Sequence, residues 1–362
     1  MKLPLLLLAV AAAFLPEGMA RGEDRARLED RDWSGVQLAW RGDPRATADA
    51  PFEPEVTPGR RSSRRAQRRA AARRRAQPDD LPVELGPKAP PAAAESGGQQ
   101  QKPISHRDQP VGANADGRQR FDLFLPAGCS GGGMPLVVWI HGDSWRDGSK
   151  ADCPILWLTE EGYAVASIGY RLSDTATFPA QLDDCRAAID EIARNAEVWG
   201  IDPERIAVVG TGGGGHLAAL VGLAPAAPAG RRVAAICAVA APAHLTTLGP
   251  EHDRPSSAAS LLVGGPLQEF REAAQQASPL THVSADDPPC LVIHGSDDRL
   301  VPADQAIRLD ASLEAAGVDS SLVLLEGIGH APAIDKGSRS GGALQEFLDR
   351  TLGPGLAARS AD

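Results

Sequence analysis

A run of glycines between two apolar segments is the stretch of this sequence with the clearest chemical potential. Ile206–Val209 is a β-branched apolar run typical of a short buried strand, and His216–Ala224 is typical of a small apolar helix. The six residues between them, Gly210–Gly215, predict a sharp turn from strand to helix. A turn of this kind suits two chemistries, because it can hold a pyrophosphate at the helix N-terminus or display a nucleophile at its apex.

The letters of the glycine run fit both motifs. As G-x-G-x-x-G, Gly210–Gly215 matches the dinucleotide fingerprint. As G-x-S-x-G, Gly210–Gly214 matches a nucleophile elbow whose serine position, Gly212, is glycine.

The surroundings of the run disfavour nucleotide binding. A dinucleotide fingerprint normally opens its domain and needs an acidic residue about twenty positions further on. Here three predicted strands precede it, and the next strand ends at Ala238–Pro242 without an acid. A P-loop is excluded because His216, and not a lysine followed by serine or threonine, comes after the glycines. We therefore expect neither a nucleotide cofactor nor any other cofactor, and no cysteine or histidine spacing indicates a metal.

Strands and helices alternate through the second half of the chain. Continuous apolar strands between helices predict an α/β fold with a mostly parallel central sheet and helices on both faces. Ligand-binding loops in such folds follow the carboxyl ends of the strands. The predicted strands are Arg120–Pro126 (half-exposed), Leu136–Ile140, Ala164–Ile168, Ile206–Val209, Val233–Val239, Leu291–His294 and Ser321–Leu325. The predicted helices are Phe178–Trp199, His216–Ala224, Ala306–Ala316 and Ala343–Leu352.

Three of these loops carry motifs in a characteristic order. His141–Lys150 is similar to H-G-G-G-W-x-x-G-S-K, the elbow comes next, and His294–Pro302 reads H-G-x-x-D-x-x-V-P before Gly327–His330 as G-x-G-H. This set resembles the α/β-hydrolase superfamily, and in particular its carboxylesterase branch of feruloyl and acetyl-xylan esterase-like (BD-FAE-like) proteins. Gly162–Leu172 strengthens the likeness, which covers about residues 106 to 353 and implies the α/β-hydrolase fold.

The resemblance implies a role for each matching residue. His330 matches the general base, and Asp298 matches the acid that orients it. The oxyanion hole would be formed by the N–H of Gly213 and by the loop of Gly142, Asp143 and Ser144.

Two departures from the family pattern bear on activity. Gly212 has no oxygen with which to attack an acyl carbon. Asp143 and Ser144 replace glycines of the oxyanion loop, and a carboxylate pointing into the oxyanion hole would repel a developing oxyanion. We expect a pseudoenzyme or very weak esterase that takes a small ester or an acylated glycan. The alternatives are a residual hydrolase in which His330 activates water, and a non-catalytic binding protein.

The first third of the sequence differs in composition from the rest. Residues 1–20 resemble a secretory signal peptide, which predicts export to the periplasm or the extracellular space. Residues 21–105 lack periodicity and predict a disordered Arg/Pro/Ala-rich linker. The hydrolase domain is then expected at 106–355, with a cap at 244–278.

An arginine block, Arg60–Arg75, lies within this linker and is a candidate for binding polyanions. Nucleic acid is an unlikely partner, because the block lacks stacking aromatics and the remainder of a chain with net charge −10 is acidic.

The five cysteines include no C-x-x-C pair. Cys153 and Cys185 are candidates for a disulfide if the chain is exported, but spacing alone leaves the connectivity open.

Overall fold

The central strands are continuous runs of buried apolar residues. The computed structural model describes residues 104–112, 117–128, 133–225, 231–330 and 332–353. In it, β3 (Met134–Ile140) and β4 (Ala164–Ile168) are buried along their whole length. Strands that are apolar on both sides need cover on both faces of their sheet. The sequence therefore dictates a sheet enclosed between two layers.

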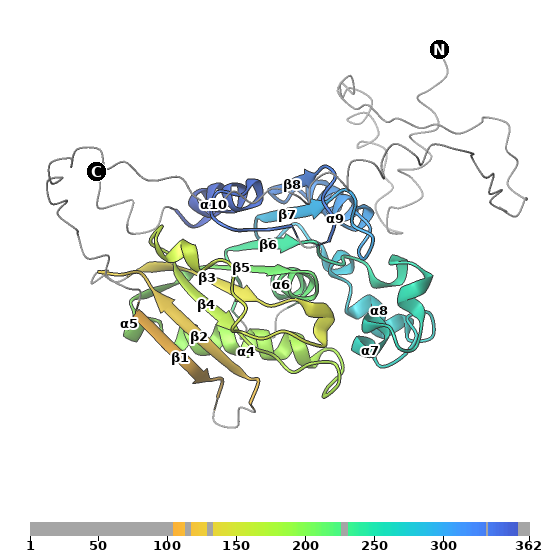
Figure 1. Ribbon diagram of the computed structural model, residues 1–362, viewed down its shortest axis with the longest axis horizontal. Coiled ribbons are helices and arrows are strands. Elements are labelled where there is room, and N and C mark those ends of the chain that lie inside the picture. The colour runs from red at the N-terminus through yellow and green to blue at the C-terminus, as the bar shows by residue number, and fades with distance from the viewer. Residues whose placement is uncertain (1–103, 113–116, 129–132, 226–230, 331, 354–362) are drawn as a thin grey trace, which may run out of the picture. The chain divides into compact units, whose positions relative to one another are not determined.

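The eight strands form one sheet in the order β1-β2-β4-β3-β5-β6-β7-β8. β1 and β2 pair antiparallel, as do β2 and β4, whereas the strands from β4 to β8 run parallel. Figure 1 shows the strands fanning across the molecule, and this mostly parallel sheet confirms the predicted α/β-hydrolase fold. The remaining strands are β1 (Ile104–Pro110), β2 (Arg120–Leu125), β5 (Ile201–Thr211), β6 (Ala235–Val239), β7 (Cys290–Gly295) and β8 (Ser320–Leu325).

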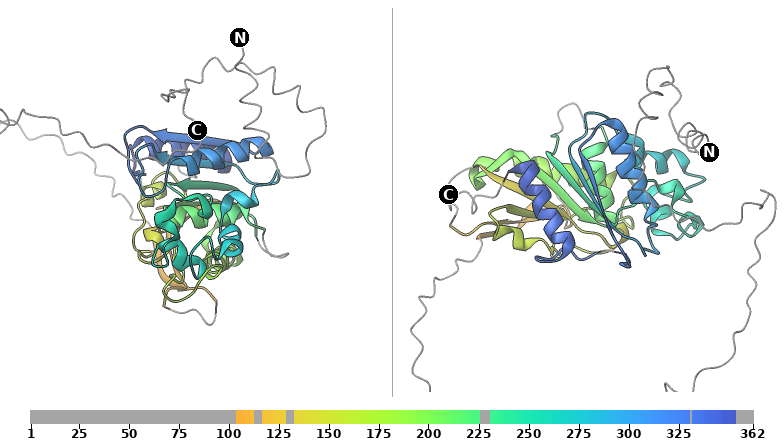
Figure 2. Two further views of the ribbon diagram at one scale, coloured as in Figure 1. Left: turned by 90° about the vertical axis from the view of Figure 1, so that its right-hand side faces the viewer. Right: turned by 90° about the horizontal axis from the view of Figure 1, so that it is seen from above.

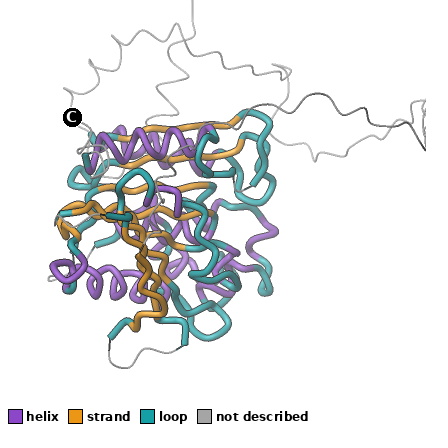
Figure 3. The backbone as a smooth tube through the Cα atoms, turned by 60° about the vertical axis from the view of Figure 1, so that its left-hand side comes forward, coloured by secondary structure: helices purple, strands orange, loops and turns teal. Residues whose placement is uncertain are grey.

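Helices cover both faces of the sheet (Figures 2 and 3). α4 (Ala180–Arg194), α6 (Gly213–Leu223) and α9 (Asp304–Ala316) contribute to one apolar layer. On the other face, α10 (Arg339–Leu352) packs with η3 (Leu156–Thr159). Three apolar residues of α10 recur at helical spacing and are buried against the sheet: Leu344, Phe347 and Leu348.

A chain of short helices follows β6, beyond the carboxyl ends of the strands in Figure 1. It occupies the segment in which we expected a cap, and none of its helices is longer than 6 residues. These helices are η4 (Leu245–Thr247), η5 (Pro250–Asp253), α7 (Ala258–Val263), α8 (Arg271–Gln276) and η6 (Pro279–His282). The other helices in the described residues are α5 (Ala196–Trp199) and η2 (Asp143–Trp145).

β1 is a strand that the sequence analysis missed. It pairs with β2, which is buried and not half-exposed as expected. Asp122 of β2 is buried and binds the side chains of Arg107 and Lys150 at 2.8 and 2.7 Å. Because β1 begins at Ile104, the expected domain boundary at residue 106 would cut the strand.

The two candidate disulfide cysteines are free thiols on opposite sides of the sheet. Cys185 lies in the α4 layer, and Cys153 packs against the α10 layer. Burial raises the pKa of Cys153 to about 12 and also raises the pKa of Cys185, so neither is a reactive thiolate. The suggested disulfide is therefore absent from this structure.

Several sequence predictions lie outside the described residues: the signal peptide at 1–20, most of the linker at 21–105 and the arginine block. Within the described part of the chain, no helix combines the length and the apolar character needed to cross a membrane.

Candidate active site

The elbow is a turn of a single residue. β5 continues through Thr211 and α6 begins at Gly213, so the prediction of a six-residue turn was wrong. Gly212 between them has φ +53° and ψ −118°, a strained conformation that L side chains rarely adopt. Its N–H donates to the carbonyl of Val239 at 2.8 Å, and its carbonyl accepts the N–H of His216 at 2.9 Å. These bonds fix the apex between β6 and the first turn of α6.

The glycines of the run meet different surroundings. A Cβ on Gly210 would overlap the carbonyl of Gly214, and a Cβ on Gly214 would overlap the carbonyls of Ile140 and His141. These two glycines therefore allow α6 to pack closely against β3 and β5. A Cβ on Gly212 would meet only the His330 ring, at 3.3 Å from Nε2. Packing does not require glycine at position 212, and its missing side chain would face an imidazole.

Asp298 and His330 form a hydrogen-bonded pair, although they are 32 residues apart. The Nδ1–H of His330 donates to Asp298 Oδ2 at 2.8 Å, while Oδ1 accepts the N–H groups of Leu300 and Val301 at 2.8 and 2.9 Å. The Asp298 side chain is fully buried, whereas 32% of the His330 side chain is exposed. This arrangement fixes the tautomer that leaves the lone pair on Nε2, as a general base requires.

A second histidine, His294, contacts the same carboxylate and was not identified from the sequence. Its Nε2 lies 2.9 Å from the carbonyl of Val301 and 3.2 Å from Asp298 Oδ2, which places the proton on Nε2. Burial lowers the pKa of His294, so the ring is neutral and supports Asp298 without neutralising its charge. The sequence did hold a signal, since this histidine opens the motif that contains Asp298.

The loop after β3 has an unusual backbone. Asp143, Ser144 and Trp145 have φ of +58°, +57° and +58°, in the left-handed region that favours glycine. The loop therefore keeps a conformation suited to glycine although two of the family's glycines are absent. A Cβ on Gly142 would lie 2.6 Å from the carbonyl oxygen of Thr211, which explains why this glycine remains.

The side chain of Asp143 lies outside the pocket over the elbow. Asp143 is exposed, and its Oδ2 would be 2.6 Å from a Cβ on Gly148, further along the loop. The N–H groups of Ser144 and Gly213 have no acceptor within the described residues, so both are available to an oxyanion. Asp143 thus does not fill the place of an oxyanion.

A buried histidine links this loop to the elbow helix. The indole N–H of Trp145 donates to His216 Nδ1 at 3.2 Å, and His216 Nε2 donates to the carbonyl of Ala277 at 2.6 Å. Burial lowers the pKa of His216 to about 4, which keeps the ring neutral and able to make both bonds. His216 therefore joins the loop after β3, α6 and the end of α8.

The pocket above the elbow is small, about 40 Å³. Ser144, His252 and His330 are its polar lining residues besides the elbow backbone of Gly212 and Gly213. His252 comes from the segment of short helices and binds the carbonyl of Leu300 at 2.9 Å, which closes one side of the pocket. The apolar wall consists of Trp145, Pro242, Leu248, Ala258, Leu300 and Val301.

The structure brings most of the predicted site residues together. Gly212, Gly213, Ser144 and His330 line one pocket with Asp298 directly behind His330. Gly142 and Asp143 do not line it, and Trp145, His216 and His252 are additions that sequence reasoning missed. Within the described ranges, no group of three or more metal-ligating side chains is arranged to hold an ion.

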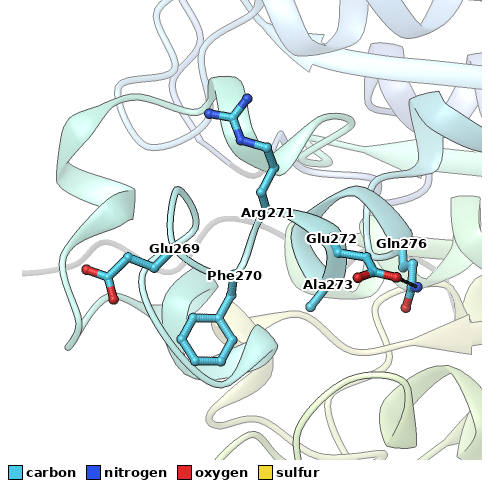
Figure 4. A pocket seen from close by; sticks show the side chains of 6 residues that line it. All are labelled: Glu269, Phe270, Arg271, Glu272, Ala273 and Gln276. Atoms are coloured by element: carbon cyan, nitrogen blue, oxygen red, sulfur yellow. Dashed lines mark hydrogen bonds between the residues drawn. The ribbon is translucent and has the colours of Figure 1, made fainter.

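A larger hollow, about 390 Å³, lies along α8 and shares no residue with this pocket. In Figure 4 the side chains of Glu269, Phe270 and Arg271 diverge, and Glu272 is engaged by Gln276. Polar groups that point apart do not form a binding constellation.

Comparison with known protein families identifies the family to which this site belongs. A family model described as BD-FAE matches residues 121–313, which run from β2 to α9 and include Gly212 and Asp298. The chain belongs to the BD-FAE family. His330 lies beyond the matched range, but its bond to Asp298 joins it to the BD-FAE site.

Curated relatives of this BD-FAE protein are esterases by name. The probable carboxylic ester hydrolase LipM of Mycobacterium tuberculosis is 33% identical over 189 residues, which are 48% of this chain and 44% of LipM. Esterase LipC of the same organism is 28% identical over 280 residues, 73% of this chain and 69% of LipC. The match thus spans less than half the length of LipM and about two thirds of LipC.

Solved structures share the fold of this BD-FAE chain. A truncated carbohydrate esterase from gut microbiota superposes with a TM-score of 0.64 at 24% identity, covering 70% of this chain and 98% of its own. An acetyl ester-xyloside bifunctional hydrolase from Caldicellulosiruptor lactoaceticus gives 0.56 at 22% identity, covering 71% and 96%. At these identities the likeness establishes the fold.

Proposed function

We propose that this chain is an esterase-lineage protein that binds a small ester or an acylated glycan but lacks the serine that would turn it over. The observation that carries the proposal is the apex of the elbow. Gly212 keeps the strained backbone of a nucleophile position, and the bond to its missing Cβ points at His330 Nε2. The pair of Asp298 and His330 thus serves a nucleophile that is absent.

The class of ligand follows from the pocket and the relatives. A cavity of about 40 Å³ holds roughly three water molecules, since one needs about 10–15 Å³. This is room for a short acyl group such as acetyl. Six apolar residues line it and none of its lining residues is Asp, Glu, Lys or Arg, so an uncharged acyl group is favoured. Names among the structural neighbours, a carbohydrate esterase and an acetyl ester-xyloside hydrolase, agree with an acetylated sugar.

A serine at position 212 tests the proposal. In Gly212→Ser the new Oγ would lie within reach of His330, which must yield by a few tenths of an ångström because the Cβ contact is tight. We expect the wild type to resist a fluorophosphonate probe and to hydrolyse 4-nitrophenyl acetate slowly. The variant should be labelled and should hydrolyse this ester on the order of a hundredfold faster.

Two outcomes would count against the proposal. Hydrolysis by the wild type as fast as by Gly212→Ser would mean that the missing serine is not limiting. A folded variant that neither reacts with the probe nor gains activity would mean that the oxyanion loop no longer supports acyl transfer. A shift in melting temperature with acetylated xylo-oligosaccharides, compared with the deacetylated sugars, reports binding independently of turnover.

Localisation is a separate proposal that rests on the first 20 residues. Their short apolar core after Lys2 supports export to the periplasm or the extracellular space. Fractionation of cells that express the full chain tests this. Retention in the cytosol of the chain with an unprocessed N-terminus would contradict it.

A further inference from the structure

His330 Nε2 is a nucleophilic atom beside the place that a side chain at position 212 would take. Because Nδ1 donates its proton to Asp298, the lone pair of the neutral ring lies on Nε2. Nε2 is 3.3 Å from the position that a Cβ on Gly212 would take, and the ring is partly open to solvent. An oriented imidazole therefore faces a space that a serine would otherwise occupy.

The missing side chain changes what can approach this nitrogen. With serine in place, Cβ and Oγ would separate an acyl carbon from Nε2, and the imidazole would act only on protons. Without them, the carbonyl carbon of a short acyl group can enter the vacated space. The free N–H groups of Ser144 and Gly213 are at hand for the carbonyl oxygen, because the backbone of the loop and elbow keeps its conformation.

The other nucleophilic side chains of the pocket, Ser144 and His252, are not held by a partner that would make them reactive. Within the described residues, no hydrogen bond joins the Ser144 hydroxyl to an imidazole that would remove its proton. His252 has its Nε2 engaged with the carbonyl of Leu300 and no carboxylate bonded to Nδ1 in the described residues. His330 alone combines an oriented lone pair, a buried carboxylate partner and the adjacent elbow.

We propose that His330 itself accepts the acyl group, so that the chain is a slow acetyl acceptor toward activated acetyl esters. This rests on the proposed function, since it uses the same acyl pocket. As the bond from Nε2 to the acyl carbon forms, the bond from that carbon to the aryl oxygen breaks and the aryl oxide leaves with its electron pair. The Nδ1 proton stays in the hydrogen bond to Asp298, giving an acyl-imidazolium.

The second step regenerates the histidine. The oxygen of a water molecule bonds to the acyl carbon, and the electron pair of the carbon–nitrogen bond returns to Nε2. Acetic acid leaves, and the remaining proton passes to solvent. No oxidant, metal or further reactant is needed. The route differs from water activation by His330 because it passes through a covalent intermediate.

The experiment is native mass spectrometry of the full chain at neutral pH, soon after mixing with 4-nitrophenyl acetate. The expected result is an acetyl adduct on the wild type that forms with a burst of 4-nitrophenolate and then decays. The adduct should be absent from His330→Gln. His282→Gln is the matched control, because His282 is partly exposed and also has one ring nitrogen bound to the protein, by the carbonyl of Gln276, but faces no elbow. It should behave like the wild type.

Gly212→Ala separates the use of the vacated space from the general reactivity of imidazole. Its methyl group presses on Nε2 and adds no nucleophile, so the burst should fall at least about tenfold, the factor that corresponds to about 1.4 kcal/mol in the barrier. Gly212→Ser carries a Cβ on the same strained backbone and serves as the folding reference in thermal melts. If Gly212→Ala does not fold, 4-nitrophenyl hexanoate replaces it, since the small pocket should reject this chain and remove the burst.

An adduct that persists in His330→Gln, or a burst unchanged in folded Gly212→Ala, overturns the inference. So does steady hydrolysis without any covalent intermediate. These failures leave the proposed function intact if Gly212→Ser still gains activity. Failure of Gly212→Ser to take the fluorophosphonate is instead a failure of the proposed function.

Discussion

The two sides of the candidate site relate differently to the sequence pattern of their family. On the acid–histidine side, Asp298 and His330 keep both the residue types and the geometry, with a second histidine, His294, behind them. On the elbow side, Gly212, Asp143 and Ser144 depart in residue type, yet their backbone keeps φ values of +53° to +58°. On the elbow side, the left-handed backbone is therefore present without the residue types of the family pattern. The comparison teaches that backbone geometry and residue type can vary separately within one site.

The largest expected effect comes from substituting Asp298 or His330, the two residues that keep the family pattern. In the Gly212→Ser background, Asp298→Asn and His330→Ala should each lower kcat by roughly 10³–10⁴, because the base loses its orientation or is absent. Steady-state kinetics with 4-nitrophenyl acetate measures this. The double change should cost little more than either single change, since the two residues act as a unit. Additive losses would show that they work independently.

Acid should lower the free energy of unfolding, because two histidines near the elbow are buried. Burial lowers the pKa of His141 and of His216 to about 4, below the ordinary value of 6.5. The unfolded chain therefore binds more protons between these values, and the free energy of unfolding falls as pH drops from 6.5 to 4. Each histidine should contribute on the order of 3 kcal/mol to this loss.

Urea unfolding at several pH values measures the effect. His141→Phe keeps an aromatic ring where His141 now stacks on Tyr170, at 4.3 Å between centroids, and removes one titrating group. The dependence on pH between 4 and 6.5 should become shallower by about one proton. An unchanged slope would mean that His141 is not the proton-binding group.

Loosening the loop after β3 should have a smaller effect. Trp145→Phe in the Gly212→Ser background removes the donor to His216 and should lower kcat roughly fivefold with little change in KM, since one neutral hydrogen bond contributes about 1 kcal/mol. The control is Trp157→Phe, which also removes an indole N–H bonded within the protein, to the carbonyl of Ile334 at 3.1 Å, but away from the pocket. Equal losses in both variants would argue for general destabilisation.

The smallest expected effect concerns Asp143. Its carboxylate lies beside Gly148 and outside the pocket, so Asp143→Gly should alter kcat of Gly212→Ser by less than about twofold. Relief of the left-handed conformation should instead raise the free energy of unfolding by about 1 kcal/mol. Thermal melts and kinetics on the same sample decide this. A large gain in kcat would show that the carboxylate does intrude on the oxyanion.

Sequence patterns predicted the apolar strands well and the polar one poorly. Ala164–Ile168 was predicted to the residue, because a short and largely apolar run between Gly162 and Gly169 leaves little choice. β1, with the sequence ISHRDQP, has neither alternation nor an apolar run, and only its pairing with β2 makes it a strand. Tertiary contact decided its structure, and no local signal could have done so.

The start of α6 was misplaced for a related reason. Each glycine in a helix costs about 1 kcal/mol relative to alanine, so Gly213–Gly215 were expected in the turn. In the fold, the close approach of α6 to β3 and β6 admits no Cβ at Gly214 or Gly215 without a clash. Packing outweighed helix propensity.

The order of the motifs predicted which residues form the site, but it did not predict the contacts that hold them in place. The positions of Asp298 and His330 followed from family motifs, but the bonds from Trp145 to His216 and from His216 to Ala277 join segments that are 71 and 61 residues apart. Local sequence patterns carry no signal of such long-range pairing.

The open space at Gly212 also has a genetic consequence. A glycine codon that ends in a pyrimidine becomes a serine codon when its first base changes from G to A. Because a Cβ at position 212 meets only the movable ring of His330, this exchange would need no second change to make room. If the gene uses such a codon, the chain stands one point mutation from the Gly212→Ser variant, and under the proposed function selection for ester cleavage has a short path to it.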